Sequence, residues 1–274
     1  MRVRLIFDLL NVGAKLPFHH QYLIGNLMRP YIDQYLKSSK EPSKACYNFS
    51  ALKGQIKVTN EGIYFNSSKV SLVFSSNDSS LVESLINQLY RNENVALGDL
   101  LLSPATVDME NPIIFTNEMK YLCLSPLAII SPNENPIDAK RFIHPAYDVF
   151  SDALYENTMN RMEQSGSTPS EIEQYFQFQL IPDKEYLSKI KGEEKKFARI
   201  YPIVINEEKN EVRGYTFPFT LYAHPKVQEF IFTCGLGVFT DKGFGMVDIA
   251  NSDHGSRAIP YFLTKKLEQV NYLN

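Results

Sequence analysis

The chain has 274 residues, with 28 Lys and Arg against 31 Asp and Glu, so its formal net charge at pH 7 is −3. Its length fits one large domain or two of ordinary size, and its 44% apolar and 12% aromatic content is typical of a globular protein. This composition excludes wholesale disorder, and the mild acidity argues against nucleic-acid binding through bulk positive charge. A local basic groove is still compatible with it.

The cysteines and the apolar runs indicate a cytoplasmic protein. Cys46, Cys123 and Cys234 are odd in number and widely spaced, which favours three buried thiols in a reducing compartment over a disulfide framework. Asp8 interrupts the first apolar run, and no segment approaches the ~20 apolar residues of a membrane span. We therefore expect no membrane association.

The first half of the chain interleaves strand and helix patterns. Residues 2–10 alternate as in a strand. After Pro17, apolar side chains from Tyr22 to Leu36 recur every three or four residues, which predicts an amphipathic helix that Pro30 kinks or restarts. Residues 37–44 form a polar loop, and a second helix begins after Asp78 or Ser79. Further strands are expected at 45–51, 55–58, 62–65, 69–74, 95–107, 112–116 and 120–131.

The second half repeats this style. A turn-rich stretch at 133–136 marks the predicted boundary between a domain of residues 1–133 and one of residues 134–274. Two halves that each combine two helices with several strands predict an α+β fold of two tandem ferredoxin-like (RRM-like) domains. The expected elements are helices at 146–165 and from Pro225, and strands at 175–182, 197–206, 211–222 and 246–250.

A glycine-rich loop at 235–246 is the sharpest motif. Two Gly-apolar-Gly units flank five residues, and Lys242 precedes the second unit. Glycine allows positive φ and a close approach to the backbone, so successive N–H groups could face a phosphate. A dinucleotide-binding loop needs a strand before it and a helix after it, whereas the order here is reversed. The alternative is a connection that merely packs tightly.

This loop resembles the signature of the CRISPR-associated RAMP proteins, and most closely that of the sixth Cas family, endoribonucleases that cut CRISPR repeat RNA. Three other stretches are similar to that family over roughly residues 1–250: Leu16–Tyr22, with its Pro-x-x-x-Gln-Tyr pattern, Phe49–Gly54 and Leu124–Leu127. The resemblance implies RNA bound in a cleft between two ferredoxin-like domains and across the glycine loop. It also implies a cut without metal or cofactor that leaves a 5′-hydroxyl and a 2′,3′-cyclic phosphate.

The same resemblance gives the partners that we expect, and charge and strand patterning add candidate RNA contacts. The partners are CRISPR repeat RNA, as the precursor transcript, and other Cas proteins of an effector complex, with a monomer and a homodimer both left open. The segment 189–199, with five basic residues against two acidic ones, is either an RNA-backbone contact or a solvated hairpin tip. The expected RNA-binding residues are Gly235, Gly237, Lys242, Gly243, Gly245, Lys53 and Lys57.

Metal-free RNA cleavage needs a base for the 2′-hydroxyl, a cation near the phosphorane and an acid for the 5′-oxygen. Histidine suits the acid–base roles because its pKa lies near neutrality. This sequence departs from the family's pattern at two places: Arg29 stands where many members have a helix tyrosine, and the loop 37–44 lacks the histidine that members often carry there. Lys44 does match the lysine found just before the next strand. No Cys/His spacing suits zinc. The catalytic candidates are His20, His19, Lys44, Arg29 and Tyr31.

Three outcomes follow for the chemistry. His19 or His20 acts as general acid–base, or Tyr31 or Tyr35 acts with Arg29 and Lys44 by orientation and charge, or the protein binds repeat RNA without cutting it. The alternative without catalysis is that His19 and His20 only begin a helix and that Lys44 is a solvated loop lysine. From a different class, a ferredoxin-like scaffold that binds no RNA also fits the sequence.

Overall fold

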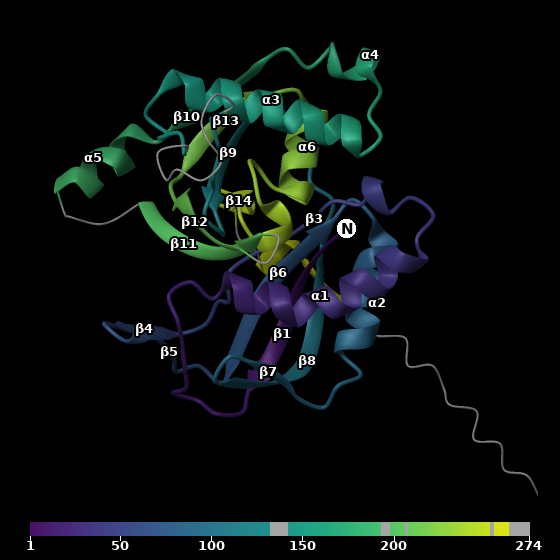
Figure 1. Cartoon of the computed structure of the whole chain (residues 1–274), viewed down its shortest axis with the longest axis vertical. Coiled ribbons are helices and arrows are strands. Elements are labelled where there is room, and N and C mark those ends of the chain that lie inside the picture. The colour runs from purple at the N-terminus through teal and green to yellow at the C-terminus, as the bar shows by residue number, and fades with distance from the viewer. Residues whose placement is uncertain (132–141, 193–197, 206–207, 253–254, 263–274) are drawn as a thin grey trace, which may run out of the picture.

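Two sheets with the same strand order organise the molecule (Figure 1). The computed structural model describes residues 1–131, 142–192, 198–205, 208–252 and 255–262. Within them, each sheet has its fourth, first, third and second core strands side by side and antiparallel, which is the ferredoxin-like order. The fold of two tandem ferredoxin-like units is thus confirmed. The strands are β8 (Leu100–Glu110), β1 (Arg2–Leu9), β6 (Lys69–Ser76) and β3 (Tyr47–Phe49) in the first sheet, and β14 (Val247–Ile249), β9 (Glu118–Cys123), β13 (Phe219–Ala223) and β10 (Phe178–Pro182) in the second.

Each sheet carries its helices on one face. The helices α1 (Gln21–Ser38) and α2 (Ser79–Leu89) pack on the first sheet, and α3 (Asp148–Gln164) and α6 (Pro225–Cys234) pack on the second. The apolar spacing predicted the buried face of α2, where Leu85 is fully buried. For α1 it predicted the helix but not its face, because Ile24 and Met28 are fully buried whereas Tyr22, expected on the apolar side, is exposed. Asp78 caps α2 as expected. The helix α1 continues through Pro30, which lies on its exposed side.

Several shorter elements lie outside the two ferredoxin-like units' core strands and helices. A short sheet combines β2 (Lys15–Leu16), β5 (Gly62–Phe65) and β4 (Ile56–Thr59), and β7 (Val95–Leu97) forms a hairpin with β8. In the second unit, β11 (Ala198–Ile205) and β12 (Glu208–Tyr215) form a two-stranded ribbon that lies toward α1 in Figure 1. The remaining elements are β15 (Ala258–Tyr261), α4 (Pro169–Ile172), α5 (Lys184–Gly192) and the 3₁₀ turns η1 (Pro42–Lys44), η3 (Thr240–Lys242) and η4 (Gly255–Arg257).

The chain passes from one sheet to the other between β8 and β9. The predicted division at residue 133 falls within 132–141, outside the described residues, and β15 returns from the second half to pair with β8. The stretch 112–116, expected as a strand, has no strand pairing, and Pro112 lacks the N–H that a ladder needs. The expected strand 211–222 is divided at Pro218 into β12 and β13.

A buried charge network joins the two units. Arg2 of β1 contacts Glu110 at 3.2 Å and Asp248 of β14 at 3.7 Å, and Arg257 lies 2.9 Å from the same Asp248 oxygen. Arg2 also donates to the Phe232 carbonyl at 2.9 Å. Because these charges are almost fully buried, each depends on its partners, and the network ties β1 and β8 to β14.

The cysteine prediction was wrong for one pair. A disulfide joins Cys46, before β3, to Cys234, at the end of α6, whereas Cys123 is free. The two are 188 residues apart, and only the packing of α6 against β3 brings their Cα atoms to 5.6 Å. Spacing along the chain therefore carries no sign of this pair. Within the described part of the chain, no helix is long and apolar enough to cross a membrane.

Candidate functional site

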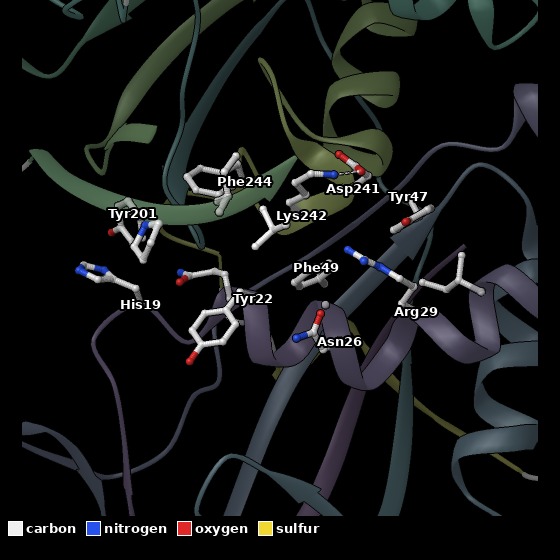
Figure 2. A pocket seen from close by; sticks show the side chains of 16 residues that line it. His19, Tyr22, Asn26, Arg29, Tyr47, Phe49, Tyr201, Asp241, Lys242 and Phe244 are labelled. Atoms are coloured by element: carbon white, nitrogen blue, oxygen red, sulfur yellow. Dashed lines mark hydrogen bonds and ion pairs between the residues drawn. The ribbon is translucent and has the colours of Figure 1, made fainter. Parts of the chain in front are cut away.

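A pocket lies where the first helix of one unit meets the glycine-rich loop of the other (Figure 2). It encloses about 80 Å³, enough for several water molecules. Strand β3 forms part of its wall and the β11 ribbon closes one side. We call it the site pocket, and its polar or charged lining residues include His19, Gln21, Tyr22, Asn26, Arg29, Tyr47, Tyr201, Asp241 and Lys242.

His19 presents a nitrogen suited to proton transfer. Its ring meets Tyr201 edge-on at 4.8 Å between ring centres, and its Nδ1 is buried with no hydrogen-bond partner among the described residues. Burial, with a smaller contribution from the charge of Arg199, lowers the pKa of His19 below its usual value. A neutral imidazole with an unpartnered nitrogen can accept a proton at neutral pH.

His20 has a different environment although it is the next residue. Its Nδ1 lies 3.3 Å from the Pro17 carbonyl, and its Nε2 accepts from the Leu52 N–H at 3.2 Å. The neutral tautomer with its proton on Nδ1 satisfies both contacts, and burial lowers the pKa of His20. His20 is 4% exposed, so it joins the beginning of α1 to the segment after β3 rather than facing the site pocket.

Two cations face the site pocket from opposite sides. Figure 2 shows Arg29 extending from α1 toward Tyr47, and Lys242 reaching from the glycine-rich loop. Lys242 Nζ pairs with Asp241 at 2.7 Å. Burial, with the charge of Asp241 next, raises the pKa of Tyr47 to about 12, so this phenol keeps its proton at neutral pH. The pocket thus combines an imidazole base, two cations and a protonated phenol.

The glycines of the loop are required by packing. Gly235, Gly237, Gly243 and Gly245 have φ values of 80°, 82°, 79° and 70°, the left-handed region that glycine favours. A Cβ on Gly235 would collide with the amide of Asn48, and one on Gly243 with the ring of Phe49. Asn48 also donates to the Phe244 carbonyl at 2.9 Å. The motif therefore allows the loop to pack directly on β3.

Most backbone N–H groups of the glycine-rich loop donate to carbonyls within the protein. The acceptors that they find within the protein leave few of them for an anion, and the expectation that successive N–H groups face a phosphate stays a prediction. What the loop presents to the pocket is instead the side chains of η3. The amides that donate to backbone carbonyls are those of Gly235, Leu236, Val238, Lys242, Gly243, Phe244 and Gly245.

Three other predicted residues lie away from the site pocket. The Tyr31 hydroxyl accepts from Asn92 at 3.2 Å, on the face of α1 toward α2. Lys44 pairs with Glu41 at 2.6 Å, in a separate depression beside Asp78. Lys57 is exposed on the β4 hairpin.

Lys53 belongs to a basic patch on another face of the first sheet. It lines a shallow groove with Arg4 and Lys69. Burial, followed by the charge of Arg4, lowers the pKa of Lys53. Among the described residues, neither Arg4 nor Lys53 has a carboxylate within ion-pair distance. Asp108 also lines the groove and Lys69 pairs with Asp8 at 3.9 Å, so Arg4 and Lys53 are the cations there that are open to an anionic partner.

The lining residues that sequence reasoning missed come mainly from other segments. Tyr47 is on β3, and no local pattern links it to α1. Tyr22 and Asn26 could have been found, because they precede Arg29 by about two turns and one turn of the helix, respectively, on one face. Much of the 189–199 segment lies outside the residues whose side chains the structure describes. Among the described residues, no cluster of His, Cys, Asp or Glu could hold a metal ion.

Comparison with known proteins gives one family and one fold. Residues 109–249 match the model of the CRISPR-associated protein Cas6 C-terminal region. A protein from a Cas6-related gene of Pyrococcus furiosus is 19% identical with a TM-score of 0.73, covering 92% of this chain and 99% of that one. A RAMP protein that binds different RNA substrates is 19% identical with a TM-score of 0.72, covering 91% and 99%. No curated protein sequence matches the chain.

Proposed function

The chain belongs to the Cas6 family of CRISPR-associated proteins, and from this premise we propose that it binds CRISPR repeat RNA and cleaves the precursor transcript in the site pocket. The observation that carries the proposal is that His19, whose buried Nδ1 has no hydrogen-bond partner among the described residues, lines the same pocket as Arg29 and Lys242. At about 80 Å³, the pocket suits a phosphate group and its neighbouring 2′-hydroxyl rather than a run of bases.

The proposed reaction uses side chains alone. His19 accepts the proton of the 2′-hydroxyl as the oxygen attacks the adjacent phosphorus in line. Arg29 and Lys242 stabilise the negative charge that develops on the phosphorane oxygens. The bond from phosphorus to the 5′-oxygen breaks, and that oxygen takes a proton from the Tyr47 phenol. The products are a 2′,3′-cyclic phosphate and a 5′-hydroxyl.

The basic groove of the first sheet supplies a second contact for the RNA backbone. Arg4 and Lys53 lie there without a neutralising carboxylate at ion-pair distance among the described residues. Burial and, after it, the charge of Arg4 lower the pKa of Lys53, and a phosphate between the two cations would relieve their mutual repulsion. This contact would hold RNA by its backbone, so it adds affinity at any sequence.

A second candidate function is RNA binding without cleavage. It is favoured by the polar loop 37–44, which has no histidine, and by Lys44, which is paired with Glu41 outside the site pocket. In that case the same pocket and groove would retain the RNA. The complex of this protein with its RNA would then associate with other Cas proteins.

A cleavage assay in chelator separates these functions. The probe is a transcript carrying the repeat of the CRISPR array that accompanies this chain, incubated in EDTA. We expect cleavage to continue in EDTA and to stop when the nucleotide at the cut carries a 2′-deoxyribose. A shifted complex without products would establish the binding function instead. The absence of any shift at low salt would refute both.

His19 is tested with a matched histidine. We expect His19→Gln to lower the cleavage rate at least ~10²-fold, the usual contribution of a general base, with little change in RNA affinity. His224→Asn is the control, since His224 caps α6 beside Tyr175 and asparagine is a good cap. Equal rates for His19→Gln and the control would remove His19 from the mechanism.

The pH profile gives a second readout for the same residue. Because burial lowers the pKa of His19, its neutral basic form already predominates at pH 7. The rate should therefore fall on acidification through that lowered pKa and stay level from neutral pH upward. In His19→Gln the acid limb should disappear from rates measured between pH 5 and 8.

A further inference from the structure

Arg161 of α3, which does not line the site pocket, holds the glycine-rich loop. Its Nη1 donates to the carbonyls of Gly235 at 2.8 Å and Gly237 at 3.3 Å. Its Nη2 donates to the Cys234 carbonyl at 2.6 Å and to the Thr240 hydroxyl oxygen at 3.1 Å. One guanidinium therefore connects the end of α6, the first Gly-apolar-Gly unit and the start of η3.

The charge of Arg161 suits this place. The carbonyls at the carboxyl end of α6 carry the negative end of the helix dipole and need donors. Burial lowers the pKa of Arg161 to about 10, which still leaves it charged at neutral pH. The planar fork of an arginine can reach several acceptors at once, whereas the ammonium of a lysine is a single point.

A short chain of contacts leads from Arg161 to the site pocket. Thr240 begins η3, and the next residue, Asp241, raises the pKa of Arg161 through its charge. Asp241 is paired with Lys242, which lines the site pocket. The backbone that carries Lys242 is thus fixed on one side by Arg161 and on the other by β3, through Asn48.

We propose that Arg161 is a positioning residue that places Lys242 for contact with the RNA phosphate, without touching the RNA itself. The proposal rests on the proposed function for its RNA readout. Arg161 acts on the loop whether or not RNA is present, so part of its effect is measurable on the free protein.

A double-mutant cycle tests the coupling. Affinity is measured with the repeat transcript carrying a 2′-deoxyribose at the cut, in reducing buffer, over a series of salt concentrations. We expect Arg161→Lys to weaken binding about tenfold, as for loss of charge-assisted hydrogen bonds. In the Lys242→Ala background the same change should have almost no effect. Additive effects would overturn the proposal, because Arg161 would then act independently of Lys242.

Two further variants guard against a general folding defect. Thr240→Val keeps the shape of the side chain but removes one acceptor of Arg161, and we expect about two- to threefold weaker binding that also vanishes with Lys242→Ala. Arg91→Lys, at an exposed position just after α2, is the matched arginine control and should leave affinity unchanged. A Thr240→Val protein with full affinity would contradict the proposal.

Hydrogen exchange separates this inference from the proposed function. In the free protein, Arg161→Lys should speed exchange of the amides of 235–246 while those of β1 stay protected. If wild-type protein binds no repeat RNA, the proposed function fails, and the exchange result still decides whether Arg161 holds the loop. Unchanged exchange in 235–246 would overturn its positioning role.

Discussion

One disulfide lies beside both the glycine-rich loop and the polar loop 37–44, whose first two residues belong to the end of α1, yet the two loops have opposite characters. Cys46 follows the polar loop and Cys234 precedes the glycine-rich loop. The glycine-rich loop packs on β3 and its amides mostly donate within the protein. The polar loop is mostly exposed, and Lys44 pairs with Glu41 in a surface depression outside the site pocket. A loop residue therefore reaches the site pocket when its loop packs near α1, as Lys242 does, and nearness to α1 in sequence is not sufficient, as Lys44 shows.

The largest expected effect tests whether packing fixes the glycine-rich loop. Gly243→Ala places a methyl group against the Phe49 ring at a φ of +79°, so we expect a loss of about 2–5 kcal/mol in the free energy of unfolding. Gly13→Ala is the control, since φ there is +90° but the space is open, and only about 1–2 kcal/mol should be lost. Denaturant unfolding of both variants measures the difference. Similar losses would mean that strain in the backbone, not packing, explains the motif.

The next effect tests the link between the two loops. Reduction of the disulfide should lower the free energy of unfolding by about 2–4 kcal/mol, because the unfolded chain loses a long-range constraint. Thermal melts with and without dithiothreitol measure it. Cys46→Ser should melt like the reduced protein under both conditions, and Cys123→Ser should retain the response. A melting temperature insensitive to dithiothreitol would show that the two loops are not covalently joined.

The smallest effect compares one lysine from each loop. Lys242→Ala should reduce the slope of log affinity against log salt by about 0.7, as for one lost phosphate contact on single-stranded RNA. Lys44→Ala should leave the slope unchanged, because Lys44 lies outside the site pocket. Titrations with the repeat transcript at several salt concentrations measure both. A change in slope for Lys44→Ala alone would reverse the comparison.

Local patterns predicted much of the fold. Apolar periodicity identified both helices of the first unit, because one buried face imposes that spacing. The strand β15 was missed, since Ala258–Tyr261 is short and its pairing partner β8 is far away in the sequence. The sequence pattern predicted one strand at 211–222 where the structure has the ribbon strand β12 and the sheet strand β13, because only their different pairing partners distinguish them.

The candidate site was predicted less completely. His19, Arg29 and Lys242 were identified from the sequence and line one pocket. His20 and Tyr31 were chosen with them and face elsewhere, because their local spacing does not show which side of α1 meets the second unit. Tyr47 and Arg161 were not identified, since both matter through contacts with distant segments.

By itself the sequence determined the class of fold, the family resemblance and the glycine pattern, all of which rest on local spacing. Only the tertiary structure decided that His19 faces the pocket while His20 is buried, and that Cys46 meets Cys234. It also decided that Gly235 and Gly243 serve packing against β3. The reason is physical: periodicity reports which face of an element is buried, whereas a site depends on which other element covers that face.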